Sequence, residues 1–179
     1  NSKFINNTSP FNGGATNANG KLIVESSIFK NNKADHFGGA LEPYENGGAI
    51  FCLNIDCNNS TFENNYAECY GGAIFISSKG KSTIKNSKFI NNTAKLNGGA
   101  IYLDNTNSHV DLIHNIFEKN TAERGNEGLI VYTYGEFDKI SQNYYGTENP
   151  NWSSHLLYEL FQKFRYLLLF KRSLKKLYL

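Results

Sequence analysis

The chain has 179 residues, enough for one domain with a hydrophobic core, and its formal net charge of +2 is unevenly spread. Residues 1–151 carry 12 Lys+Arg against 15 Asp+Glu, whereas residues 152–179 carry 6 against 1. The acidic body lacks the basic face that nucleic-acid binding requires, and no run of 18 apolar residues forms a transmembrane candidate, so neither nucleic-acid binding nor membrane spanning is expected.

A repeat begins at the first residues of the chain. It consists of a phenylalanine, an asparagine three places later and a pair of glycines nine places later. No signal peptide is recognisable, and the first residue already lies inside a repeat, so we expect a fragment of a longer protein or a truncated product. The phenylalanines are Phe4, Phe29, Phe62, Phe89 and Phe117, the asparagines Asn7, Asn32, Asn65, Asn92 and Asn120, and the glycine pairs begin at Gly13, Gly38, Gly71 and Gly98.

The last of these five copies is degraded to Asn126-Glu127-Gly128, and an extra Gly47-Gly48 pair between the second and third copies indicates a local insertion. Tyr145 marks a weaker sixth copy.

Each copy predicts about three short strands separated by polar turns. Apolar residues two apart point to the same face of a strand. Such pairs precede most of the phenylalanines by seven and five residues, as in Ile55 and Cys57, and they follow most of the glycine pairs, as in Ile74 and Ile76. Asparagine at the turn tolerates the left-handed backbone region, and the glycine pair permits backbone angles that other residues avoid.

Units this small bury their apolar faces only by stacking on one another. The sequence therefore predicts an all-β fold, a right-handed parallel β-helix of about five to six coils over residues 1–152. The LxxLxLxxN core of leucine-rich repeats is absent, as are the GGxGxD of calcium-binding repeats and the six-residue period of left-handed β-helices.

Residues 153–179 form a basic, leucine-rich tail with helical periodicity. Three interpretations stay open: a helix that caps the last coil, a segment that attaches to a membrane surface through its lysines and Arg172, and degenerate or off-frame sequence after an interrupted gene.

The FxxN and GGA[ILV] repeats resemble those of chlamydial polymorphic outer-membrane proteins and of adhesin-like surface proteins of methanogenic archaea. The segment from Asn143 to Trp152 is similar to the NxWWGxNxP segment that closes the β-helix of the archaeal proteins. The resemblance covers residues 1 to about 155. It implies a pectin-lyase-like β-helix at a cell surface, extracellular or secreted. No autotransporter barrel, Ig-like domain or anchor follows in this chain.

The fold implied by the resemblance also supports polysaccharide lyases and glycosidases, which need a basic residue beside clustered carboxylates or a pair of acids. The body has one arginine, Arg124, and no DD or GHG motif. Its aspartates are scattered singly, although Asp104 and Asp111 flank a loop across which they could approach each other. We therefore predict no enzyme, no catalytic or metal-binding residues and no cofactor. The aspartates are Asp35, Asp56, Asp104, Asp111 and Asp138.

Three other groups of residues have a structural interpretation. His114 occupies a polar turn position, and His36, His109 and His155 share no metal-ligand spacing. Cys52 and Cys57 fall on core positions and Cys69 in a turn, which favours free thiols over a disulfide or a zinc motif. Sequons begin at Asn6, Asn7, Asn58, Asn59, Asn91 and Asn151, and glycosylation there remains open because the fold itself requires Asn6 and Asn91.

The predicted function is display at a cell surface. A rigid rod with Asn, Ser, Thr and the aromatic residues Phe51, Phe75 and Tyr102 on its outer face suits weak, repeated contacts to glycans or proteins. We expect a non-catalytic adhesin-like or stalk segment with unspecified binding residues. The alternative is an extracellular polysaccharide lyase or glycosidase.

Overall fold

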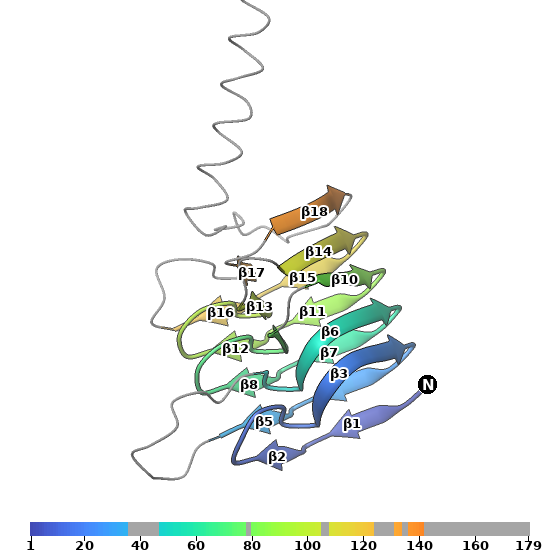
Figure 1. Cartoon of the computed structure of the whole chain (residues 1–179). Helices are drawn as coiled ribbons and strands as arrows, with labels where there is room; N and C mark the ends of the chain where they lie inside the picture. Colours follow the sequence, from blue (N-terminus) through green and yellow to red (C-terminus); the bar gives the residue numbers. More distant parts are fainter. Residues whose placement is uncertain (36–46, 78–79, 105–107, 124–130, 134–135, 142–179) are drawn as a thin grey trace, which may run out of the picture.

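The computed structural model of the chain describes residues 1–35, 47–77, 80–104, 108–123, 131–133 and 136–141. Within these residues every regular element is a β-strand. The strands form three sheets of five, eight and five strands, and strands that neighbour each other in a sheet run parallel. Figure 1 shows the coils stacked along one axis, with β1 to β3 at one end and β18 at the other. The predicted parallel β-helix is confirmed.

One five-stranded sheet, called here the Phe sheet, carries the repeat phenylalanines. Parallel pairing aligns each phenylalanine with the next, and neighbouring rings stack with centroids 4.6 to 5.0 Å apart. This distance is the strand spacing itself, so the backbone ladder dictates the ring stack. The strands are β1 (Lys3–Ile5), β4 (Ile28–Lys30), β7 (Thr61–Glu63), β11 (Lys88–Ile90) and β15 (Ile116–Glu118).

The second five-stranded sheet, the Ala sheet, has strands of two residues. In four of them an alanine points inward and is buried, because only a small side chain fits where the wall comes close to the glycine turns. The strands are β2 (Thr8–Ser9), β5 (Lys33–Ala34), β8 (Tyr66–Ala67), β12 (Thr93–Ala94) and β16 (Thr121–Ala122).

The eight-stranded sheet, the long sheet, follows two sides of each coil. β3 (Thr16–Glu25) and β6 (Ile50–Asn58) run through both sides as single strands. Later coils insert residues at the corner and divide the same path in two. The divided pairs are β9 (Ile74–Ile76) with β10 (Gly80–Lys85), β13 (Ile101–Leu103) with β14 (Ser108–Ile113), and β17 (Val131–Thr133) with β18 (Glu136–Ser141).

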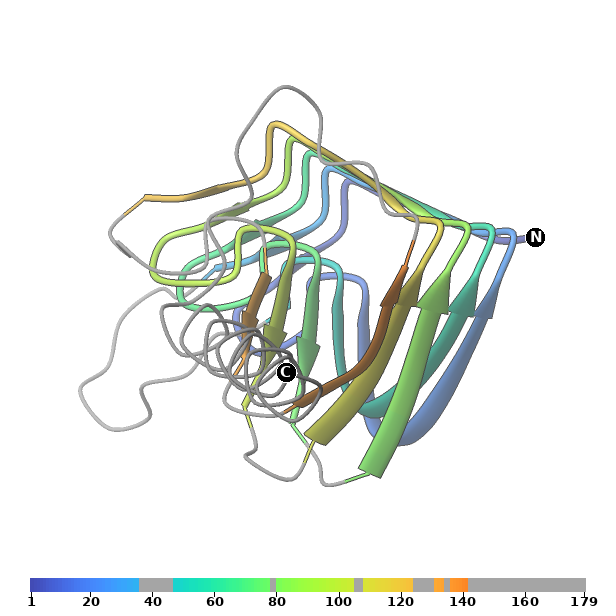
Figure 2. The ribbon, with the colours of Figure 1, turned by 90° about the horizontal axis from the view of Figure 1, so that it is seen from above.

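The coil is right-handed. In Figure 2 the later coils lie nearer the viewer, and the chain runs counterclockwise from the long sheet through the Phe sheet and the Ala sheet. A counterclockwise turn that advances toward the viewer defines a right-handed helix, which is the hand that parallel strand connections favour.

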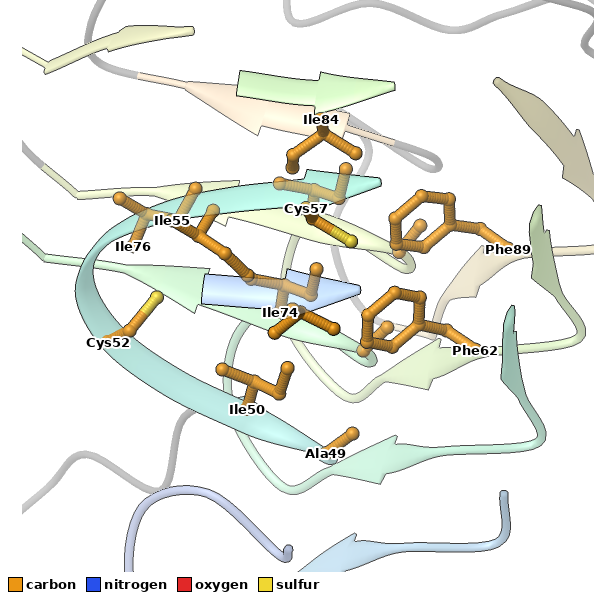
Figure 3. Packing of buried hydrophobic residues seen from close by; sticks show 14 of the residues in the cluster. Ala49, Ile50, Cys52, Ile55, Cys57, Phe62, Ile74, Ile76, Ile84 and Phe89 are labelled. Carbon is orange, nitrogen blue, oxygen red and sulfur yellow. The ribbon is translucent and has the colours of Figure 1, made fainter. Parts of the chain in front are cut away.

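The core lies between the three sheets. Isoleucines from both sides of the long sheet meet the phenylalanine stack there, and Ile50, Ile55, Ile74 and Ile84 are fully buried (Figure 3). The apolar residues that the sequence places two apart along a strand therefore face inward, as predicted.

The asparagine three places after the phenylalanine is buried in every copy but the first, and in the inner copies it links its coil to both neighbours. The Asn92 side-chain oxygen accepts hydrogen bonds from the backbone N–H and the side-chain amide of Asn65, at 3.1 and 2.9 Å. Its own amide donates to the Phe62 carbonyl at 3.0 Å and to the Asn120 side-chain oxygen at 2.9 Å. Asn32 and Asn65 repeat this geometry. The asparagine side chain of the FxxN motif thus supplies hydrogen bonds to backbone groups at a turn, where the strand ladder is interrupted.

Left-handed backbone angles recur at the two turns that flank the Phe sheet. One column lies two residues after the phenylalanine and the other three residues before it, which confirms the predicted turn role of His114. The first column is Asn6, Asn31, Asn64, Asn91 and Lys119, with φ of 52 to 57°, and the second is Ser26, Asn59, Asn86 and His114, with φ of 48 to 54°.

The two glycines of a pair differ in conformation. Gly71 and Gly98, each first in its pair, have φ of +66° and +68°. Gly72 is second in its pair and lies outside the left-handed region. A Cβ there would stand 2.1 Å from the Gly99 carbonyl oxygen of the next coil. The prediction of special backbone angles holds for the first glycine, whereas the second serves close approach between coils.

Several predictions fall on residues outside the described ranges. These are the tail at 153–179, the closing segment from Asn143 to Trp152, the sixth copy at Tyr145, the degraded motif at Asn126 to Gly128, and the pair Gly38-Gly39.

Candidate binding surface

The outer face of the long sheet contains a shallow depression of about 290 Å³ that spans three coils. Strands β3, β6 and β10 line it mainly with alternate residues, because every second side chain of a strand points away from the core. Cys57, which is buried in the core, is the exception. The lining residues are Ile23, Glu25, Asp56, Cys57, Asn58, Thr83 and Lys85.

The depression combines groups of different chemistry. Ile23 is 70% exposed, an unusual position for an isoleucine, and provides an apolar surface. The Asn58 amide donates to Glu25 at 3.0 Å, and its oxygen accepts from Asn86 at 2.9 Å. Lys85 is exposed, and among the described residues no acid pairs with it. An apolar residue beside amide, hydroxyl and ammonium groups suits a ligand rich in hydroxyl groups.

Several lysines and acids on the outer faces pair between neighbouring coils. Lys21 lies 2.6 Å from Asp56, Lys81 lies 3.0 Å from Asp111, and Lys30 lies 3.0 Å from Glu63. Lys95 likewise pairs with Glu68. At partly exposed positions such pairs contribute little to stability, about 0–1 kcal/mol each. Each acid in such a pair nevertheless already has a lysine as its partner.

The predicted candidate acids lie at several places along the coils. Asp35 pairs with Lys33 in the Ala sheet wall, and Asp56 and Asp111 pair with lysines on the long sheet. Asp104 directly follows β13, where partial burial raises the pKa of its carboxyl group. Asp138 lies in β18. Among the described residues, no three His, Cys, Asp or Glu side chains come close enough to hold a metal ion.

Two of the basic candidates lie among the described residues. His114 occupies a left-handed turn beside the Phe sheet, and His109 lies in β14 in register with Lys81 and Glu136. His36, His155 and Arg124 lie outside the described residues.

The cysteines are free thiols, as predicted, and two of them are buried. Burial raises the pKa of Cys52 to about 12 and that of Cys57 to about 11. The Cys57 sulfur lies 3.6 Å from the Ser87 hydroxyl, which offsets part of the burial effect. Cys69 is partly exposed and follows the Ala sheet strand β8. Thiols with raised pKa values hold little thiolate at neutral pH, so neither buried cysteine suits nucleophilic chemistry.

The prediction that three aromatic residues lie exposed on the outer face is wrong. Phe51, Phe75 and Tyr102 do point outward from the long sheet, but Phe75 and Tyr102 are each only 3% exposed and Phe51 is partly buried. They form a second aromatic stack, with ring centroids 5.4 and 5.1 Å apart, and Tyr70 lies 4.5 Å from Tyr102. Strand alternation showed which way these rings point. It gave no signal that other residues cover them.

The exposed asparagines at the turn form their own ladder. The Asn91 amide donates to Asn64 at 2.8 Å, Asn64 donates to Asn31 at 3.2 Å, and Asn31 donates to Asn6 at 3.0 Å. The sequons at Asn6 and Asn91 therefore coincide with ladder positions, as the sequence interpretation anticipated.

Among the described residues, no helix is long and apolar enough to cross a membrane. No curated protein and no solved structure matches the chain.

Two segments match a family model, the Chlamydia polymorphic membrane protein repeat, at residues 59–77 and 86–104. Each segment begins just before a Phe sheet strand and ends just after the strand that follows the glycine pair, so the match covers three sides of a coil. The coil that the structure repeats is therefore similar to the repeat of the Chlamydia polymorphic membrane proteins, which is that of a surface or outer-membrane protein.

Proposed function

We propose that the stacked coils form a non-catalytic, adhesin-like segment of a protein displayed on the outside of the cell, which attaches to glycans or proteins. The observation that supports this most is the depression on the long sheet. It combines an exposed isoleucine with an amide, a hydroxyl and an ammonium group that pairs with no acid among the described residues, over three coils. The match to a membrane-protein repeat supports a location at the cell surface.

The geometry favours weak binding that is multiplied by repetition. The depression is shallow and would contact only a few groups of a ligand. A shallow site of this kind achieves useful affinity when several copies engage one surface, because each later contact forms at a high effective concentration. A stiff rod suits this role, since stacked coils hold their outer faces in a fixed relation.

The first experiment compares binding of single and clustered protein to a panel of immobilised glycans. We expect measurable binding only for the clustered protein, and we expect Asn58→Ala and Lys85→Ala to weaken it. Lys88→Ala is the matched control, because Lys88 is also an exposed lysine but lies on the Phe sheet. Equal effects of Lys85→Ala and Lys88→Ala would place binding elsewhere, and no binding to any glycan would leave a protein as the ligand to be sought.

The competing function, a polysaccharide lyase or glycosidase, has a separate test. We expect no release of reducing or unsaturated sugars from pectin or polygalacturonate, because an acidic body repels such polyanions. Sugar release by purified protein that disappears in Asp104→Asn or Asp111→Asn would overturn the non-catalytic proposal.

A further inference from the structure

The first coil contains an irregularity at the corner of the long sheet. Strand β3 pairs with β6 in register at Thr16 to Ala18 and again from Lys21 onward, and the register shifts between Ala18 and Lys21. Two residues of β3, Asn19 and Gly20, therefore oppose the single residue Leu53 of β6. This is a β-bulge, in which the extra residue leaves the backbone ladder.

The two bulge residues are held by few contacts. Asn19 is exposed, and its side chain has no hydrogen-bond partner among the described residues. A Cβ added at Gly20 would meet no heavy atom within 4 Å, so open space surrounds this glycine. The backbone between Asn19 and Gly20 is thus less constrained by packing than the paired residues on either side.

We propose that Asn19 is a site of spontaneous deamidation. The backbone nitrogen of Gly20 attacks the side-chain carbonyl carbon of Asn19, which forms a nitrogen–carbon bond and a five-membered succinimide. The bond from that carbon to the amide nitrogen breaks, and ammonia leaves with the proton that Gly20 gives up. Water then opens the ring at either carbonyl, which leaves aspartate or isoaspartate at position 19.

The other described asparagine–glycine pairs are protected by the coil. Gly98 has φ of +68°, and its Cβ position lies 2.4 Å from the Ile101 carbonyl oxygen, so the turn is tight. The Asn97 carbonyl also accepts a hydrogen bond from Gly71 at 3.1 Å. Gly13 has the same conformation, with φ of +66°. Attack by either glycine nitrogen requires the backbone to rotate, and these turns prevent that rotation.

Deamidation changes the charge beside the candidate binding surface. Lys21 follows the bulge and pairs with Asp56, which lines the depression. A new carboxylate at position 19 adds negative charge on the same side of β3. Isoaspartate also lengthens the main chain by one carbon, which the bulge accommodates because it already lies outside the ladder.

The test follows deamidation at each asparagine by peptide mapping after the full chain has been incubated in mildly alkaline buffer. We expect Asn19 to convert roughly tenfold or more faster than Asn12 and Asn97, which corresponds to a barrier lower by about 1.4 kcal/mol. The same incubation in urea should bring the three rates together, because unfolding removes the protection of the turns. An isoaspartate-specific methyl-transfer assay identifies the second product.

Gly20→Ala is the matched control variant. The added methyl group has room, so the fold should persist, while the more hindered nitrogen should slow the conversion of Asn19 alone. The proposal is wrong if folded protein converts Asn19 no faster than Asn97, or if the preference for Asn19 is unchanged in urea.

Discussion

At the scale of single residues, the glycine pair illustrates how one motif meets two constraints. The first glycine needs a left-handed angle, and the second needs the absence of a side chain. Gly71 shows the first constraint, with φ of +66°, and Gly72 shows the second, because a Cβ there would meet the next coil. The first constraint comes from the turn within one coil, where a Cβ at Gly71 would meet the Ile74 carbonyl oxygen. The second comes from stacking at the strand spacing, which leaves no room for a methyl group between neighbouring turns.

We predict that Gly72→Ala destabilises the protein strongly. The new methyl group would overlap backbone atoms of Gly99 and Thr93, which cannot move without displacing the next coil. Overpacking of this kind costs about 1–3 kcal/mol or more. Urea unfolding measures the loss, and Gly20→Ala, which meets open space, should leave the free energy of unfolding nearly unchanged. Similar losses in the two variants would show that packing between coils is not the reason for the glycine.

The buried thiols predict a loss of stability at high pH. The folded protein holds the thiol protons of Cys57 and Cys52 up to about 11 and 12, whereas an unfolded thiol loses its proton near 9.0. The contribution to stability is thus fully present below pH 9.0 and is lost as the pH rises from there toward 11 and 12. Unfolding measured on both sides of pH 9 should show a shallower decline for Cys52→Ala than for the parent protein.

At the scale of elements, the buried and the exposed asparagine ladder differ in how much their hydrogen bonds contribute to stability. The buried ladder connects a turn to the two neighbouring turns, and water cannot replace its bonds. The exposed ladder of Asn6, Asn31, Asn64 and Asn91 joins similar side chains at similar distances, but water competes for them. Hydrogen bonds of similar length therefore stabilise the fold more in the buried ladder than in the exposed one.

We predict that Asn92→Ala is far more damaging than Asn64→Gly. Removing the Asn92 side chain leaves the Asn65 N–H and the Phe62 carbonyl unpaired, and each such buried group costs about 1–3 kcal/mol. Asn64→Gly keeps the left-handed angle of 54° and loses only exposed hydrogen bonds. Thermal unfolding of the two variants gives the comparison. A loss for Asn64→Gly as large as that for Asn92→Ala would contradict the distinction.

At the scale of the whole molecule, each coil is held by its neighbours. The backbone ladders, the phenylalanine stack and both asparagine ladders all run along the same axis. An inner coil has such contacts on two sides, and the described first coil has them on one. Stability should therefore depend on where along the stack a contact is removed.

We predict that Phe89→Ala destabilises the protein much more than Phe4→Ala. Phe89 is fully buried between Phe62 and Phe117, whereas Phe4 is partly exposed and stacks only on Phe29 among the described residues. Truncating a buried phenylalanine costs about 3–5 kcal/mol. Hydrogen exchange should show the loss of protection in Phe89→Ala spreading to the coils on both sides. Loss confined to β11 would contradict nearest-neighbour coupling.

The sequence by itself determined the parallel coils, the phenylalanine stack and the turn asparagines. Each of these depends on residue spacing that recurs in the chain. Because the coils stack at a constant strand spacing, residues at equivalent positions of successive repeats come into contact. The family-model match at residues 59–77 and 86–104 rests on the same recurrence. Ligand and catalytic activity have no such repeated signal, and they stay predictions.

Only the tertiary structure decided what each outward side chain meets. Phe75 and Ile23 both point away from the core, yet Phe75 is 3% exposed and Ile23 is 70% exposed. The same limit applies to Asn19-Gly20 and Asn97-Gly98, which are identical dipeptides in an open bulge and a tight turn. Strand periodicity fixes the direction of a side chain, but coverage depends on segments far away in the sequence, whose positions are set by how the coils pack.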